Sequence, residues 1–428
     1  TIDASATDNG NGGKVVLWSD VHNADSVTRV NGSITAKAGP NGGDGGKVET
    51  SGHVLNVDDS QVSTLASQGN SGQWLLDPYD ITIYSGVQTA GVTSTGGVYT
   101  TNTNTSILNT STLQNALAGG NVEVSTTGAG TQTGNITVSS AIATTGNAGN
   151  LTLTAAGDIS IQGNITLTGS SALLVKAVNN IYLGSGASPN TITTAGGDVS
   201  LYSNTSNQTS VIAGAAIKLF TGSAIYSNGG AITLGGGSDS ATLASGTVVP
   251  TGYAVESSST VWGGVTLGYF NVAHDSANKF YSGGGNITVR GKSTSKLSGE
   301  SDGIATLEGL TMDAGTTGNI TIEGMGAGSG ATYSGGFYLG MWSTTGSATS
   351  LFKTANGNIT ITGTGTGATN NRGIILCCNA TKPVTIEATG TGSITLTGTG
   401  STQDFVLYGA HNILAANAAI TLTGTGSG

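Results

Sequence analysis

Charged residues, aromatic residues and prolines are all scarce in this chain of 428 residues. Charged residues make up 8% of it and aromatic residues 5%, and it contains 5 prolines. An ordinary soluble domain has about 25% charged residues. A chain this poor in Lys, Glu, Leu and Met is not mainly helical, because those residues fill the surfaces and cores of helices.

Basic residues are the rarer charged residues, with 13 Lys and Arg against 23 Asp and Glu and a formal net charge of −10. Nucleic acids and anionic membranes are bound through Lys and Arg, so the composition argues against both as partners. No run of about 20 apolar residues is present to span a bilayer as a helix. The chain also begins at Thr1 without a basic and apolar leader. If the protein is secreted, we expect its export signal to lie upstream or to have been removed.

Cysteine is nearly absent, and the two cysteines, Cys377 and Cys378, are adjacent. Consecutive strand residues point to opposite faces, so one interpretation is a buried thiol beside an exposed thiol. A vicinal disulfide is the alternative, and it would be strained because its Cα atoms are only about 3.8 Å apart. Pairing between two molecules is a third. Two cysteines offer too few ligands for a metal ion, and we expect neither a metal nor another cofactor.

Glycine, with 72 copies, and Thr, Ser, Asn, Ile and Val dominate the composition. From Gly134 onward a short unit recurs, in which Gly-Asn or Gly-Asp precedes two apolar residues separated by one Thr or Ser. This spacing is typical of a strand with one buried face. Examples of these pairs are Ile165/Leu167, Ile232/Leu234, Ile320/Ile322, Ile359/Ile361 and Ile394/Leu396.

Each such unit is too short to bury its apolar face alone, so neighbouring units must stack. The sequence therefore predicts an all-β fold, a right-handed parallel β-helix with loop or extra-strand insertions and one short helix. The residues between the apolar pairs, such as Thr166, Thr233 and Thr360, are expected to face solvent.

The pairs recur every 15 to 18 residues between Ile165 and Ile232. We interpret each step as one coil and expect about 20 residues per coil. Later steps are wider, which predicts segments that protrude from the coils. We expect them at residues 247–264, 278–285 and 329–345.

A helix is predicted over residues 111–118, with Ser111 or Thr112 as its N-cap and Gly119 in the left-handed conformation at its end. It marks a change of pattern along the chain. We divide the sequence into an N-terminal β-helix segment at 1–83, an irregular segment with the helix at 84–120, regular small coils at 121–246, and wider coils with insertions at 247–428.

The N-terminal motifs are specific enough to suggest a family. They are DNGNGGKVVLWSD at 8–20, GSITA at 32–36, GGDGGKVETSG at 42–52, WLLDPYDITI at 74–83 and STLQNALAGGNVEVSTTG at 111–128. In this order they resemble the segment that follows the secretion domain in filamentous-haemagglutinin-like exoproteins of the two-partner secretion pathway. The resemblance is dense over residues 1–170 and beyond them rests on the style of the repeats.

This resemblance implies a secreted β-helical rod on the exterior of a Gram-negative outer membrane. Such rods pass through a dedicated outer-membrane β-barrel transporter and serve adhesion, aggregation or biofilm formation. The secretion domain and its Asn-Pro-Asn-Gly-type motif are not in this sequence. We therefore expect the chain to be an internal or processed part of a longer exoprotein.

An enzyme is the first rival hypothesis, because parallel β-helices also host polysaccharide lyases and hydrolases. Those enzymes need clustered carboxylates. The acidic residues here are isolated in sequence, as at Asp158, Asp198, Glu323 and Glu387. The four histidines, His22, His53, His274 and His411, show none of the metal-ligand spacings, and we expect no catalytic site. Asp77 and Asp80 flank Pro78, which suits either a calcium ligand pair or a corner that satisfies its own backbone amides.

Aromatic residues gather where the repeat spacing is wide. They are Tyr253, Trp262, Tyr269, Phe270, Phe280, Tyr281, Tyr333, Phe337, Tyr338 and Trp342. They either pack under loops and fill wide coils, or form a surface that binds a glycan or a protein partner. We select Tyr253, Trp262, Tyr269, Phe270 and Trp342 as the candidate binding residues.

Asn-x-Ser/Thr sequons recur just before the buried apolar residue of the repeat. They include Asn135, Asn150, Asn164, Asn286, Asn319 and Asn358. This pattern is either how the repeat turns a corner, or a set of glycosylation sites, because some adhesins of the resembled family are modified at such sequons.

The sequence favours a structural or adhesive rod that contacts glycans or proteins on host cells or sister cells. The chain ends on a full repeat without a polar or helical cap, so either the native polypeptide continues or copies stack end to end. A filament subunit is therefore the second hypothesis, and a polysaccharide-active enzyme is the third.

Overall fold

The computed structural model describes residues 1–86, 92–95, 98–101, 105–126, 133–186, 188–206, 215–256, 263–269, 276–294, 301–328, 333–340, 349–367, 369–376 and 382–426. Of residues 92–95, 98–101, 105 and 269 it describes the backbone only. The chain forms two compact units, Thr1–Lys176 and Ala177–Gly428, called unit 1 and unit 2 below. Within the described residues, no helix is long and apolar enough to cross a membrane.

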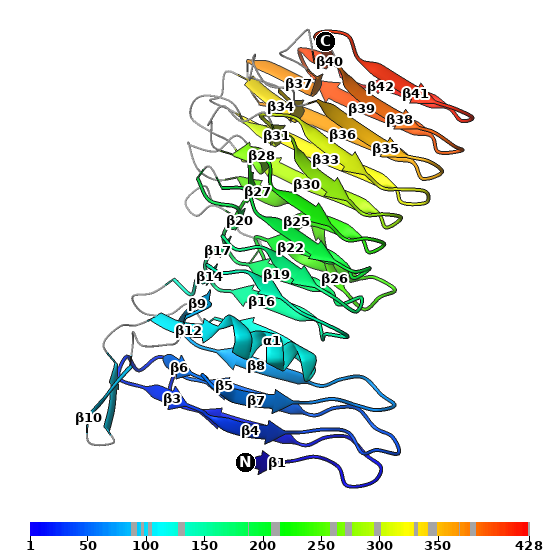
Figure 1. The fold of residues 1–428 in the computed structure, drawn as a ribbon. Coiled ribbons are helices and arrows are strands. Elements are labelled where there is room, and N and C mark those ends of the chain that lie inside the picture. Colours follow the sequence, from blue (N-terminus) through cyan, green and yellow to red (C-terminus); the bar gives the residue numbers. More distant parts are fainter. Residues whose placement is uncertain are drawn as a thin grey trace. The chain divides into compact units, whose positions relative to one another are not determined.

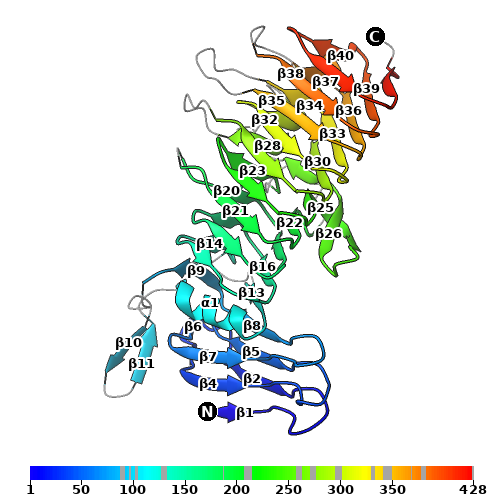
Figure 2. The ribbon, with the colours of Figure 1, turned by 45° about the vertical axis from the view of Figure 1, so that its right-hand side comes forward.

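Unit 2 consists of three parallel sheets, each built from stacked strands (Figures 1 and 2). The first, in stacking order, contains β20 (Ile181–Leu183), β23 (Ile217–Phe220), β28 (Gly263–Tyr269), β31 (Asp302–Thr306), β34 (Tyr333–Leu339), β37 (Asn370–Leu376) and β40 (Gln403–Leu407). The second contains β21 (Thr191–Thr194), β24 (Ala224–Tyr226), β29 (Asn278–Tyr281), β32 (Leu310–Asp313), β35 (Ser350–Thr354), β38 (Val384–Ala388) and β41 (Asn412–Ala415). The third contains β22 (Val199–Ser203), β25 (Ile232–Thr242), β30 (Ile287–Ser293), β33 (Ile320–Ala327), β36 (Ile359–Thr366), β39 (Ile394–Gly400) and β42 (Ile420–Gly424).

The chain visits these three sheets in turn, so each coil has three sides. The third sheet carries two additional strands, β26 (Val248–Gly252), antiparallel to β25, and β27 (Ala254–Glu256), parallel to β30. The predicted parallel β-helix with extra strands is therefore confirmed.

Unit 1 has the same coiled arrangement at its core. Its longest stack is β2 (Lys14–Trp18), β5 (Lys47–Ser51), β8 (Gln73–Asp77), β13 (Asn121–Ser125), β16 (Leu151–Ala155) and β19 (Leu173–Ala177). A second stack is β12 (Thr105–Asn109), β9 (Asp80–Tyr84), β14 (Ile136–Val138) and β17 (Ile159–Ile161). Shorter stacks are β1 (Ile2–Asp3), β4 (Gly32–Thr35) and β7 (Ser60–Ser63), then β15 (Ile142–Ala143) with β18 (Ile165–Leu167), and β3 (Val27–Arg29) with β6 (Val54–Asn56). An antiparallel hairpin of β10 (Val92–Thr95) and β11 (Val98–Thr101) projects from the coils (Figures 1 and 2).

The predicted helix is present as α1 (Thr110–Ala118) and ends at Ala118 as expected, but the predicted N-cap and the predicted left-handed conformation of Gly119 are wrong. Asn109 is the N-cap, because its side chain accepts hydrogen bonds from the backbone N–H of Ser111 at 2.8 Å and from the Ser111 hydroxyl at 2.6 Å. Gly119 has φ −98°, and the positive φ of +145° falls on Gly120. The helix contacts β7 and β15, and its end is hydrogen-bonded into both neighbouring coils, through Thr64 N–H to Gly119 O and Gly149 N–H to Leu117 O.

The predicted alternation of buried and exposed residues is largely confirmed. Ile165 and Leu167 are buried while Thr166 is partly exposed, and Thr360 is partly exposed as well. The prediction is wrong for Thr233, which is 6% exposed. The β25–β26 hairpin accounts for this, because β26 contacts β22 and the Ser245 hydroxyl in the hairpin turn donates to Asp198 ahead of β22.

The predicted coil size is wrong. Successive apolar pairs belong to different sides of one coil: Val199 pairs with Ile232, whereas Ile181 pairs with Ile217 in another sheet. Equivalent corner residues of neighbouring coils lie 22 residues apart at Asn150 and Ala172, and 39 apart at Asn319 and Asn358. A step of 15 to 18 residues is therefore only part of a coil.

Parts of two predicted protrusions are regular strands of the coils, whereas residues 329–332 and 341–345 of the second one lie outside the described residues. Residues 278–281 form β29, with Phe280 fully buried, and residues 333–339 form β34, with Phe337 fully buried. Phe337 packs edge-on against Phe352 of β35, with ring centroids 6.2 Å apart. The third prediction, at 247–264, coincides in part with the additional strands β26 and β27.

Glycines make one edge of four coils of unit 2 narrow. Gly291, Gly324, Gly363 and Gly398 are register partners on β30, β33, β36 and β39. A Cβ atom on any of them would overlap the backbone of the neighbouring sheet. The two sheets are therefore in backbone contact there, while the preceding Ile and Leu residues fill the wide part of the coil.

Candidate functional site

Of the candidate aromatic residues, Tyr253 has a described side chain. It lies between β26 and β27, partly buried, and its hydroxyl is hydrogen-bonded to Glu323. Glu323 also accepts a hydrogen bond from Arg290 Nε at 2.7 Å. Burial raises the pKa of Tyr253, and the nearby Glu323 carboxylate adds to the rise. Tyr253 is thus held by contacts within unit 2.

The other candidate aromatic residues remain predictions. Trp262, Phe270 and Trp342 lie outside the described residues, and of Tyr269 only the backbone, at the end of β28, is described. Phe280 and Phe337 are in the core, which supports the coil-filling interpretation for these two residues. Cys377 and Cys378 also lie outside the described residues, directly after β37.

Most of the sequon asparagines form ladders along the corners of the coils. Asn286 Oδ1 accepts the backbone N–H of Asn319 at 2.9 Å, and Asn319 Oδ1 accepts that of Asn358 at 2.7 Å. Asn358 Oδ1 continues to Ser393 N–H at 3.0 Å, and Asn150 Oδ1 accepts Ala172 N–H at 2.9 Å. Each of these asparagines therefore accepts a hydrogen bond from a backbone N–H of the next coil, which explains why asparagine occurs at this position of the repeat.

A second ladder starts at the Asp-Pro-Tyr-Asp corner. Asp80 Oδ1 accepts Asn135 N–H at 2.6 Å, and Asn135 Oδ1 accepts Asp158 N–H at 2.8 Å. Asp80 thus bonds the next coil rather than its own corner. Asn150, Asn164, Asn286 and Asn358 are exposed, whereas Asn135 and Asn319 are only partly so. Glycosylation of the exposed copies stays a prediction.

An acidic cluster lies on the outer face of unit 1. Burial, together with the charges of Glu49 and Glu123, raises the pKa of Asp77 to about 6. Glu123 accepts hydrogen bonds from Gln73 at 2.7 Å and Thr154 at 3.1 Å. In the part of the chain that the structure describes, no three His, Cys, Asp or Glu side chains come together as metal ligands.

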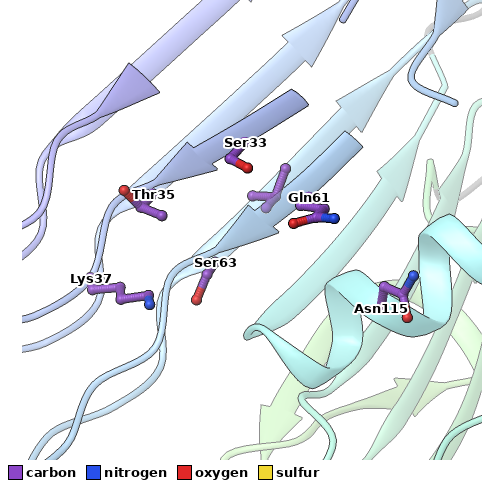
Figure 3. Close-up of a pocket in the computed structure, with 7 residues that line it drawn as sticks. Ser33, Thr35, Lys37, Gln61, Ser63 and Asn115 are labelled. Carbon is purple, nitrogen blue, oxygen red and sulfur yellow. The ribbon is translucent and has the colours of Figure 1, made fainter. Parts of the chain in front are cut away.

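A polar groove of about 450 Å³ lies on the outer face of β4 and β7 beside α1 (Figure 3). The register of the two strands places Ser33 beside Gln61 and Thr35 beside Ser63. Figure 3 shows these four side chains on the strands and Asn115 on the neighbouring helix. The groove is lined by Ser33, Thr35, Lys37, Gln61, Val62, Ser63 and Asn115.

The groove is suited to hydrogen bonding. Its hydroxyls, amides and the Lys37 ammonium donate and accept hydrogen bonds, as a hydroxyl-rich ligand such as a sugar requires. The Ser63 hydroxyl is buried and has no hydrogen-bond partner in the described part of the chain. Thr35 donates to Asp3 at 2.7 Å, and this bond, with those from Ser5, lowers the pKa of Asp3 to about 2.

Sequence reasoning missed this groove for a physical reason. Ser33, Gln61 and Asn115 are outward residues of two strands and a helix, and their spacing in the sequence matches no ligand-binding motif. Only the parallel register of β4 with β7 and the position of α1 bring them together.

No protein-family model matches this sequence, and no curated protein matches it closely enough to count as a relative.

Proposed function

We propose that this chain is part of a secreted, surface-exposed rod of the filamentous-haemagglutinin-like type, which mediates adhesion, aggregation or biofilm formation by binding rather than catalysis. The observation that carries the proposal is the parallel β-helix itself, whose coils bury Ile, Leu and Val and present mainly Thr, Ser and Asn outward. The N-terminal motifs at 8–20, 42–52 and 74–83 add the resemblance in sequence.

Coil-by-coil stacking suits export through an outer-membrane transporter. Each coil pairs with its immediate neighbours, so a chain that emerges unfolded gains structure one coil at a time. Such a fold also spans distance with little sequence variety, which is what a spacer between a cell and its target needs.

A bead assay tests this proposal. The purified chain is coupled to beads, and attachment is measured on epithelial cells, on sister bacteria and on glycan-coated surfaces, with the heat-unfolded chain on matched beads as control. The proposal predicts attachment that depends on the folded chain. Equal attachment by folded and unfolded chain, or none by either, would reject it.

A further inference from the structure

A regular array of threonines covers the outer face of the last strands of the third sheet. Thr360, Thr362 and Thr364 of β36 are register partners of Thr395, Thr397 and Thr399 of β39. Thr421 and Thr423 of β42 continue the first two rows, and Thr425 continues the third through a hydroxyl contact of 2.5 Å with Thr399. We call these nine residues the threonine lattice.

The backbone beneath the lattice is in close contact with a neighbouring sheet. Gly363 and Gly398, on the inner face of the same strands, are pressed against the backbone of the first sheet. Neighbouring parallel strands are about 4.8 Å apart and alternate residues along a strand about 6.6 Å apart. The lattice is therefore a regular grid of methyl and hydroxyl groups.

The lattice is free of outward charges in an acidic chain. On the same outer face, β30 and β33 carry Arg290, Lys292 and Glu323, and the second sheet carries the Lys353–Glu387 ion pair. Asp404, next to the lattice, lies on the inner side, where it accepts the N–H groups of Gly400 and Gly426. With a net charge of −10, two copies repel at most faces, and this one lacks that repulsion.

We infer that the threonine lattice binds the threonine lattice of a second copy of this chain, so that two rods pair side by side. The inference rests on the proposed function and deepens it by naming the partner for aggregation. Two identical grids have the same spacings by construction, so every row meets a row across a two-fold contact. Threonine is β-branched and has few rotamers to lose, and interdigitated identical side chains form dry interfaces between stacked sheets.

The size of the lattice sets the strength of the contact. The nine threonines, eight on β36, β39 and β42 and Thr425 directly after β42, cover roughly 300 Å² on one copy, against about 800 Å² for a standard interface. A single pair is therefore weak, and many pairs acting together on a cell surface hold two surfaces. A multivalent measurement is needed to detect it.

The test uses beads coated with the full chain, whose clustering is followed by light scattering. The lattice variant, Thr364→Glu with Thr397→Glu, places two carboxylates on the contact face of each copy. The control variant, Thr311→Glu with Thr385→Glu, adds the same charge at partly exposed threonines on the outer face of the second sheet. Circular dichroism and thermal unfolding check that both variants fold.

Wild-type and control beads are expected to cluster, and lattice-variant beads to need at least about tenfold more surface chain, because like charges on the two contact faces repel each other. Lattice-variant beads are also expected to stay out of wild-type clusters. Absence of wild-type clustering, or equal loss in the control, would overturn the inference. Attachment to cells, measured on the same beads, distinguishes a failure of this inference from a failure of the proposed function. Attachment without clustering would overturn only the pairing of two chains. Clustering without attachment would overturn only the adhesive role.

Discussion

Gly324 of β33 and Gly336 of β34 lie so close together that a Cβ atom on Gly324 would overlap the carbonyl oxygen of Gly336. Gly324 follows Ile320 and Ile322 on the inner face of the same strand, both fully buried. The strand therefore runs from a wide part of the coil, filled by isoleucine, into a narrow part where two backbones touch.

Gly324→Ala is expected to destabilise unit 2 by about 3 kcal/mol, because the two sheets must separate to admit a methyl group. Met325→Ala is the matched control, since this neighbouring side chain is 36% exposed and its truncation leaves little cavity. Urea unfolding followed by circular dichroism measures both. A Gly324→Ala midpoint equal to that of Met325→Ala would mean that the sheets are not in contact.

The inner residues of the strands were predictable from sequence, and their pairing was not. Ile181/Leu183 and Val199/Leu201 carry the same pattern because every side of a coil buries one face in the same way. They nevertheless belong to different sheets. The spacing of apolar residues predicts which side chains point inward. Which strands are neighbours follows only from the register, for example the pairing of Ile181 with Ile217.

Candidate sites were less predictable, because they depend on contacts between segments distant in sequence. Thr233 is buried by a hairpin whose turn reaches Asp198, and nothing in the local pattern distinguishes it from Thr166. The polar groove arises from the register of Ser33 with Gln61. The sequence pattern predicts that the sequon asparagines lie at corners of the coils. It does not show that Asn319 accepts a hydrogen bond from the backbone N–H of Asn358, because Asn358 belongs to the next coil.

Ile320→Asp is expected to cost several kcal/mol, because it places an unpaired charge in a side of the coil that is fully closed to solvent. Thr321→Asp is the control one residue away, on the partly exposed outer face between Thr288 and Thr360, and should cost little. Leu396→Asp, on β39, should behave like Ile320→Asp. Hydrogen exchange around β33 and β39 measures the loss locally, and similar exchange in Ile320→Asp and Thr321→Asp would refute the inward orientation.

Asp77 should make unit 1 less stable at neutral pH than at mildly acidic pH. Its folded pKa of about 6 lies above the unfolded value of about 3.9, because burial and the charges of Glu49 and Glu123 disfavour its charged form. The destabilisation is complete above pH 6, fades as the pH falls from about 6 to about 4, and is absent below that range.

Asp77→Asn should therefore unfold at a higher temperature than the wild type above pH 6, and at the same temperature below about pH 4. Glu49→Gln removes one of the charges that raise the pKa of Asp77, so it should move this window to lower pH. Thermal unfolding of the three proteins between pH 3 and 8 checks both expectations. A difference between Asp77→Asn and wild type that does not change with pH would assign the effect to packing instead of ionisation.

Adhesion, if it resides in this chain, should depend on the aromatic residues between 247 and 342 and not on the regular coils. Regular coils offer Thr, Ser and Gly faces with little apolar area, whereas exposed aromatic side chains supply most of the binding energy in recognition surfaces. Trp262→Ala with Tyr269→Ala, or Trp342→Ala, should weaken attachment at least about tenfold without lowering the unfolding temperature, because a hot-spot side chain contributes about 2 kcal/mol. Tyr84→Ala is the control, since this aromatic residue is 47% exposed on β9 of unit 1.

Deletion of residues 151–172, one coil of 22 residues, should shorten the reach of the chain and leave its affinity unchanged. Attachment of coated beads to cells measures all four variants, and unchanged attachment after the aromatic substitutions would assign the adhesive part to a segment outside this sequence.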